Sequence, residues 1–142
     1  MTVLRLTFTD TEFERPVLRD KFDLLLGVVA TMQVVVGDRL LYREVMFPIV
    51  ELRVALAQWL REGLPTGADF EFVSMESDEP GLVWFRRQAG GSWRAGSVHQ
   101  EYPEIQSWTD AEVRNAVRRF TADVDDWVSA HLNVRVEEMI SM

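Results

Sequence analysis

A serine, a histidine and a glutamate alternate in one short segment and could form a hydrolytic triad. These residues are Ser97, His99 and Glu101. Catalysis would need the histidine between the serine hydroxyl and the carboxylate, with the serine on a sharp turn. In a strand, however, residues two apart point to the same face in a row. We therefore expect no triad, and the sequence predicts no catalytic residue.

Metal and cofactor chemistry finds equally little support. The chain has no cysteine, which excludes thiolate metal sites and cysteine nucleophiles, and it has only two histidines. Of these, His131 is expected at the end of a helix, where an imidazolium suits the helix dipole. Asp78 and Glu79 lack the remaining ligands of a calcium loop. Gly90-Gly91 precedes a strand, so it offers no helix N-terminus to a phosphate. The sequence predicts no metal site and no cofactor.

The charge balance limits the classes of partner. Lys and Arg number 15 against 23 Asp and Glu, giving a net charge of -8. Such a field repels phosphate backbones and favours a basic protein, so we expect no nucleic acid. The most apolar stretch, 24–36, is too short to cross a bilayer, and the first residues do not resemble a signal peptide. We expect a cytoplasmic protein without membrane contact.

The apolar pattern predicts two groups of strands, each followed by an amphipathic helix. Pro48 suits the start of the first helix and Gly63 its end, with Glu51 on the solvent face. Thr109 and Glu112 form a capping-box signature before the second helix. The expected strands cover 3–9, 24–36, 40–47, 70–76, 82–87 and 93–100, with a loop over 11–21 and a short closing strand over 134–140. The sequence predicts one α+β domain over residues 1–142 in the order βββαβββα. Its antiparallel sheet has about six or seven strands, with both helices on one face.

Folding the second half as a meander separates its charges. Turns at Glu79 and Gly90 would place Phe72 and Arg94 on either side of Arg86. Carboxylates would then gather at the other end of the sheet beside two aromatic residues. The expected partner-binding residues are Glu76, Asp78, Glu79, Glu101, Tyr102, Glu104 and Trp108. Unpaired carboxylates beside exposed aromatics are typical of a hot spot for a basic partner. A solvated acidic rim, with Trp108 tucked in before the helix, is the alternative.

The same meander is apolar on both faces. Trp84 lies on one face, and Phe85 and Trp93 on the other. Two helices cover only one face of such a sheet, and a large bare apolar patch is rare on a monomer. We expect the second face to be buried in a homodimer or against a partner. A curled sheet holding a small apolar ligand is the rival interpretation.

Three segments of the second half carry a resemblance. They are FVSME at 72–76, GLVWF at 81–85 and WRAGSVHQE at 93–101. The chain resembles a group of small bacterial proteins of unassigned function through these segments. It is also similar to bacterial immunity proteins, which neutralise toxins, in size, acidity and order of strands and helices. The resemblance implies an inhibitory, non-enzymatic role, and no catalytic residue can be carried over from it.

Three functions therefore stay open. The first is a non-enzymatic protein-binding module, an immunity-like inhibitor of a basic protein. The second is a small-ligand-binding protein or minor enzyme with a pocket between sheet and helices. The third is a structural homodimer.

Overall fold

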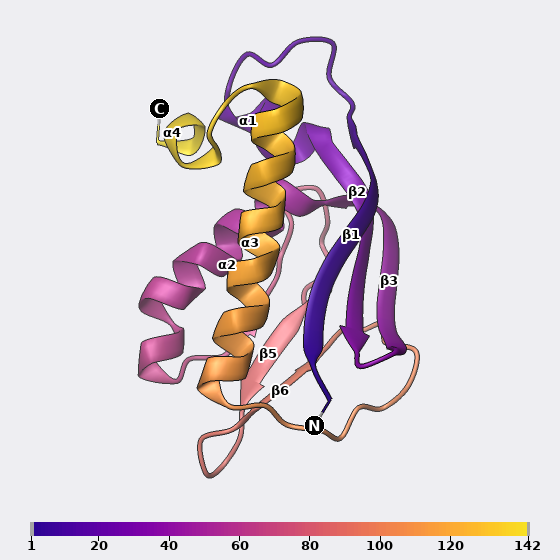
Figure 1. The fold of residues 1–142 in the computed structure, drawn as a ribbon, viewed down its shortest axis with the longest axis vertical. Coiled ribbons are helices and arrows are strands. Elements are labelled where there is room, and N and C mark those ends of the chain that lie inside the picture. The colour runs from indigo at the N-terminus through magenta and orange to yellow at the C-terminus, as the bar shows by residue number, and fades with distance from the viewer. Residues whose placement is uncertain (1, 142) are drawn as a thin grey trace.

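Two three-stranded antiparallel sheets and four α-helices make up the fold (Figure 1). The computed structural model describes residues 2–141. The strands are β1 (Leu4–Phe13), β2 (Val28–Val36), β3 (Arg39–Pro48), β4 (Phe70–Glu71), β5 (Trp84–Arg87) and β6 (Trp93–Gly96). The helices are α1 (Lys21–Gly27), α2 (Ile49–Glu62), α3 (Asp110–Leu132) and α4 (Val136–Ile140), with a 3₁₀ turn at Leu64–Thr66. Within residues 2–141, none of the helices has both the length and the hydrophobicity to cross a bilayer.

The first sheet has the strand order β1-β2-β3. A tight turn at Gly37, with a φ of 64°, joins β2 to β3 where the sequence predicts a hairpin. The β1 strand runs four residues beyond the predicted end at Thr9, because Glu12 and Phe13 pair with β2 after a bulge. Part of the predicted loop over 11–21 is therefore strand.

The predicted long strand over 24–36 is wrong in its first part, which forms α1 and ends at Gly27. Asp20 caps this helix, because its carboxylate accepts hydrogen bonds from the backbone N–H groups of Phe22 and Asp23, each at 3.0 Å. The Asp23 carboxylate bonds back to the Asp20 N–H at 3.4 Å. This reciprocal capping starts a helix where the apolar run alone suggests a strand.

The prediction of a single sheet of six or seven strands is also wrong, because β4, β5 and β6 form a separate sheet. Phe70 faces Phe85, so the predicted pairing of Phe72 with Arg86 fails. The predicted pairing of Arg94 with Arg86 is confirmed. Only two residues of the predicted strand over 70–76 belong to β4. The rest forms a loop whose backbone is held by side chains.

The last element also differs from its prediction. Residues 134–140 include the helix α4, not a strand. Asn133 ends α3 in the left-handed conformation with a φ of 56°, which turns the chain back. Arg53 of α2 then donates to Glu137 at 2.6 Å and to Asp125 of α3 at 2.8 Å, which joins α2, α3 and α4. The capping box of Thr109 that begins α3 is confirmed.

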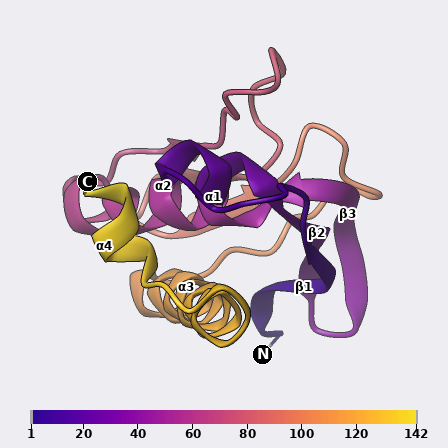
Figure 2. The same ribbon diagram turned by 90° about the horizontal axis from the view of Figure 1, so that it is seen from above.

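Aromatic packing joins α2 to the second sheet. Trp59 stacks on Phe85 at 5.3 Å between ring centroids and meets Trp93 edge-on at the same distance. On the other side of the core, Phe120 of α3 meets Phe8 of β1 at 5.9 Å. Figure 2, the view from above, shows α2 and α3 in separate layers, with the first sheet to one side of both. The core therefore lies between the helices and the two sheets.

Candidate functional site

A buried carboxylate of α2 fixes the shape of the loop between β4 and β5. We call residues 72–83 the acidic loop. Glu51 is only 8% exposed, contrary to its predicted place on the solvent face. Its carboxylate accepts hydrogen bonds from the Ser74 hydroxyl at 2.6 Å and from the Met75 N–H at 2.8 Å. Ser74 Oγ in turn accepts the Glu76 N–H at 3.2 Å. The loop is therefore preorganised although it lacks regular secondary structure.

The anchored loop presents apolar and acidic side chains together. Val73 and Met75 are each 56% exposed. Glu76, Asp78 and Glu79 follow them and are also exposed. The loop projects from the side of the molecule opposite α3 (Figure 2). An apolar centre flanked by carboxylates is thus held out from the body of the protein.

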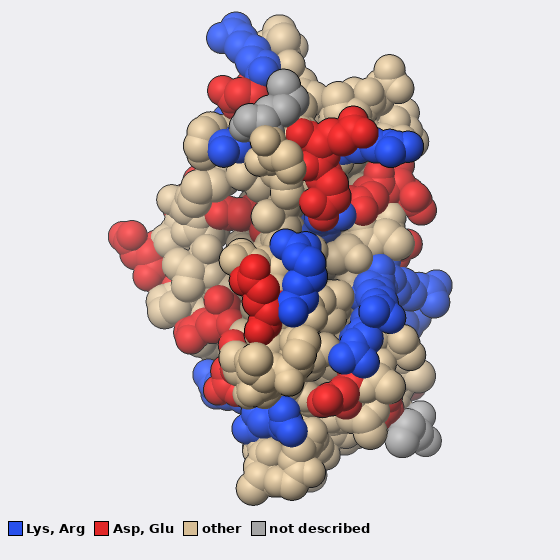
Figure 3. Space-filling model, turned by 90° about the vertical axis from the view of Figure 1, so that its left-hand side faces the viewer, with Lys and Arg blue, Asp and Glu red and all other residues tan. Residues whose placement is uncertain are grey.

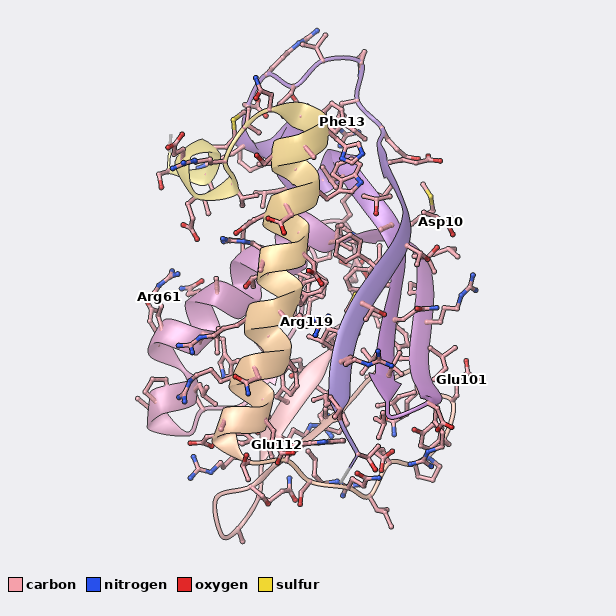
Figure 4. All side chains as sticks on the ribbon, viewed as in Figure 1. Asp10, Phe13, Arg61, Glu101, Glu112 and Arg119 are labelled. Atoms are coloured by element: carbon pink, nitrogen blue, oxygen red, sulfur yellow. The ribbon has the colours of Figure 1, made fainter. Side chains whose placement is uncertain are left out.

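A second loop, residues 97–109, lies against the first. Its Val98 N–H donates to the Gly81 carbonyl at 2.9 Å, and Val98 is half exposed. Gly81 has a φ of 81°, and a Cβ at this position would meet the Val98 side chain at 2.9 Å, so glycine permits the approach. His99 Nε2 contacts the Glu79 carboxylate. Glu101 lies beside β3, where its N–H donates to the Leu41 carbonyl at 2.7 Å (Figure 4).

The structure therefore places four of the expected partner-binding residues, Glu76, Asp78, Glu79 and Glu101, on two adjoining loops. We call Val73, Met75, Glu76, Asp78, Glu79, Val98 and Glu101 the acidic surface. The expectation that all these carboxylates are unpaired is wrong in detail. Glu76 lies 3.9 Å from the Arg15 guanidinium, and Glu79 contacts His99. Both pairs are solvent-exposed, so they leave most of the negative field in place.

The other three expected partner-binding residues are not exposed in this way. Glu104 is 3% exposed, accepts the backbone N–H groups of Ile105 and Gln106, and pairs with Arg39 at 3.2 Å. Tyr102 is half-buried beneath the Arg39 guanidinium. Trp108 is 2% exposed, and its indole N–H donates to the chain near the N-terminus. These residues fix the second loop from inside, as the alternative for Trp108 anticipated.

The expected apolar sheet face is divided between interior and surface. Phe85 and Trp93 are fully buried against Trp59, and Trp93 Nε1 donates to Asp110 at 2.5 Å. Trp84 points to the other side, where Arg86 covers its ring at 3.9 Å. The prediction that both faces are apolar is therefore wrong, since arginine shields the outer one.

The residues considered for catalysis do not assemble. Ser97 Oγ accepts the His99 backbone N–H at 3.1 Å, and the imidazole turns to Glu79 instead of the serine. Within residues 2–141, no three His, Asp or Glu side chains are grouped so that they could hold a metal ion. Tyr42 is buried next to Glu44, and burial followed by this carboxylate raises the pKa of its phenol. The phenol therefore holds its proton more tightly than an exposed tyrosine does.

Charges are mixed on the side of the molecule that carries α2 and α4. Figure 3 shows the side that carries α2 and α4, where Lys and Arg side chains lie among Asp and Glu. Burial tends to lower the pKa of Arg53, but its hydrogen bonds with Asp125 and Glu137 raise it above the ordinary value. The sequence did not predict that Arg53 and Glu51 are buried and hold neighbouring segments. The one available sign was two charged residues within the first turns of an otherwise apolar helix.

Comparison with known families gives a match over most of the chain. The family described as Domain of unknown function (DUF7878) matches residues 4–130. The chain belongs to this family. The DUF7878 match runs from the start of β1 into the last turns of α3, and so includes Glu51 and both loops of the acidic surface. No curated protein and no solved structure gives a significant match.

Proposed function

We propose that this DUF7878 domain is a non-enzymatic protein-binding module that holds a basic partner on the acidic surface. The observation that carries the proposal is the anchored acidic loop. Val73 and Met75 are more than half exposed, while Glu51 beneath them holds the backbone in one shape.

Each part of the surface has a physical role in binding. Preorganisation lowers the entropy lost when a loop is immobilised in a complex. Exposed Met and Val side chains supply apolar area that gains stability when a partner covers it. Carboxylates at the edge, together with the net charge of -8, accelerate encounter with a basic partner and disfavour acidic ones. The surface therefore suits a basic protein with an apolar contact at its centre.

An immunity-like inhibitor is the specific form of this function that we favour. In that form, the basic partner is a toxin whose activity falls when the acidic surface covers it. Tight capture by a small acidic domain needs no catalytic residue, which agrees with the dispersed positions of Ser97, His99 and Glu101. Inhibition should then follow affinity across variants of the surface.

Site-specific cross-linking identifies the partner and tests the surface together. We would place a photoreactive amino acid at Met75 and, in a matched control, at Val3, which is 61% exposed and lies just before β1. A basic protein should be cross-linked from position 75 and not from position 3. Recovery of a second copy of the same chain would instead support the homodimer.

Affinity measurements with the purified partner then test the electrostatic contribution of the acidic surface to binding. The double variant Glu76→Lys, Glu79→Lys should weaken binding at least tenfold, which corresponds to about 1.4 kcal/mol. The double variant Glu62→Lys, Glu138→Lys makes the same charge change at exposed positions of α2 and α4 and should stay within about twofold. Equal losses in the two double variants would contradict the proposal, since net charge alone would then explain binding.

A further inference from the structure

A pocket of about 350 Å³ opens on the outer side of the second sheet and reaches Gln100 in the second loop. It is formed by β5, β6 and the loop that follows β6. The residues that line it are Trp84, Arg86, Gln88, Arg94, Gln100 and Pro103. No carboxylate is among them, although the chain has 23 Asp and Glu.

Two arginines face each other in this pocket. Arg86 and Arg94 occupy directly opposite positions of the antiparallel pair β5 and β6, so their side chains leave the same face of the sheet. Like charges placed opposite each other in a sheet are destabilising unless something neutralises them. In the part of the chain that the structure describes, neither guanidinium lies within 4.0 Å of a carboxylate. An acidic protein thus keeps two unneutralised arginines together.

Both arginines are held in place by their surroundings. The Arg86 guanidinium lies 3.9 Å from the centre of the Trp84 ring. Trp84 in turn lies across Gly96 on the neighbouring strand, where a Cβ would come within 2.3 Å of Trp84 Cζ2. Arg94 donates from Nη2 to the Glu104 carbonyl. The ligand would therefore meet guanidinium groups that are already positioned.

Hydrogen-bond donors remain free in this arrangement. Arg94 Nε is buried and has no hydrogen-bond partner within the described residues. Since this nitrogen is closed to solvent, the donors open to a ligand are those of the exposed Arg86 guanidinium, which makes no hydrogen bond within the described residues. The amide groups of Gln88 and Gln100, by contrast, already bond to the backbone. The unused capacity of the pocket is therefore that of Arg86.

We propose that this pocket binds the oxyanion group of a small molecule, a phosphate or a carboxylate, between Arg86 and Arg94. Planar guanidinium groups bind both oxyanions through paired N–H···O bonds. The bound oxygens neutralise the facing charges. A volume of about 350 Å³ exceeds that of a bare ion, so the rest of the molecule lies against Trp84 and Pro103. The proposal does not rest on the proposed protein partner.

Nuclear magnetic resonance of the intact chain tests the site with simple probes. Inorganic phosphate and acetate are titrated separately at constant ionic strength, with sodium chloride as the reference salt. The indole N–H of Trp84 and the Nε–H of Arg94 should shift saturably with at least one of the two oxyanions. The anion that binds more tightly identifies the preferred group. Shifts that rise linearly with both anions, as with chloride, would overturn the proposal.

Neighbouring arginines of β5 supply a matched pair of variants. Arg86→Gln should weaken binding of the better anion at least fivefold. Arg87→Gln removes the same charge from the next residue, whose side chain leaves the opposite face and approaches Trp93, and it should change affinity less than twofold. An equal loss in both variants would reduce the effect to general electrostatics and refute the site. Spectra of both variants without anion confirm that the hairpin is folded.

Discussion

Replacing Glu51 by leucine should release the acidic loop while leaving the core intact. The variant keeps the approximate volume of the buried side chain but removes the acceptor for the Ser74 hydroxyl and the Met75 N–H. The serine hydroxyl can rotate to another acceptor, whereas the Met75 N–H is fixed by the backbone. The loop therefore loses the bond that determines its conformation.

The size of the effect follows from these contacts. A partly buried N–H without an acceptor costs about 1–3 kcal/mol, and a value near 2 kcal/mol corresponds to about a thirtyfold larger population of the open loop. Global stability should change less, because replacing a buried carboxylate with an apolar residue also removes its desolvation cost. Glu51→Gln keeps one acceptor oxygen and should give a smaller increase.

Amide hydrogen exchange separates the local effect from the global one. In Glu51→Leu, the amides of Met75 and Glu76 should exchange about thirtyfold faster, while the Phe85 amide stays within about threefold of its original rate. Glu62→Leu on the exposed side of the same helix serves as the control and should leave all three rates unchanged. Unaltered exchange at Met75, or equal acceleration at Phe85, would refute the view that Glu51 anchors the loop.

Two further predictions concern titratable groups. The hydrogen bond from Arg53, opposed by burial, lowers the pKa of Glu137. The contact therefore stabilises the fold at any pH above the ordinary carboxyl pKa. This stabilisation is lost as the pH falls through the lowered pKa. Glu137→Gln should lower the free energy of unfolding near neutral pH by up to about 1 kcal/mol, since the exposed glutamate is screened, and denaturant titrations should show this deficit shrinking in acid. Burial, with neighbouring carboxylates, raises the pKa of Tyr42 and Tyr102, the only two tyrosines. Tyrosinate absorbance should therefore stay low just above pH 10.0 and rise only on unfolding, and stability should fall there because the unfolded phenols ionise first. A folded protein that develops full tyrosinate absorbance at that pH would contradict the burial of these phenols.

Local signals in the sequence predicted the elements that they control directly. Pro48 precedes the first residue of α2 without capping it, and the Gly63 N–H closes the helix on the Trp59 carbonyl. The capping box of Thr109 and Glu112 starts α3 because it satisfies backbone N–H groups within one turn. Glycine turns also predicted the hairpin of β5 and β6, and with it the opposition of Arg86 and Arg94.

One error overlooked a local signal: the apolar run over 24–36 fits a strand throughout, but the capping by Asp20 and Asp23 that begins α1 lies just before it. The other errors come from interactions between distant residues. Helical spacing put Glu51 on the solvent face, since nothing near it in sequence reveals that the acidic loop covers that position. The division into two sheets likewise depends on this loop, which turns away after two residues of β4.

The two proposed sites share one structural element, and this determines how they can influence each other. Gly81 belongs to the acidic loop, and a Cβ on it would lie 3.9 Å from Trp84, the residue beneath Arg86 in the pocket. An oxyanion bound between Arg86 and Arg94 therefore lies next to the backbone that carries the acidic side chains. The two sites carry opposite charge, so each disfavours the other's ligand. The arginine pair repels a basic partner, and the carboxylates repel an oxyanion. Any coupling between the sites must be reciprocal: if the oxyanion strengthens partner binding by some factor, the partner strengthens oxyanion binding by the same factor.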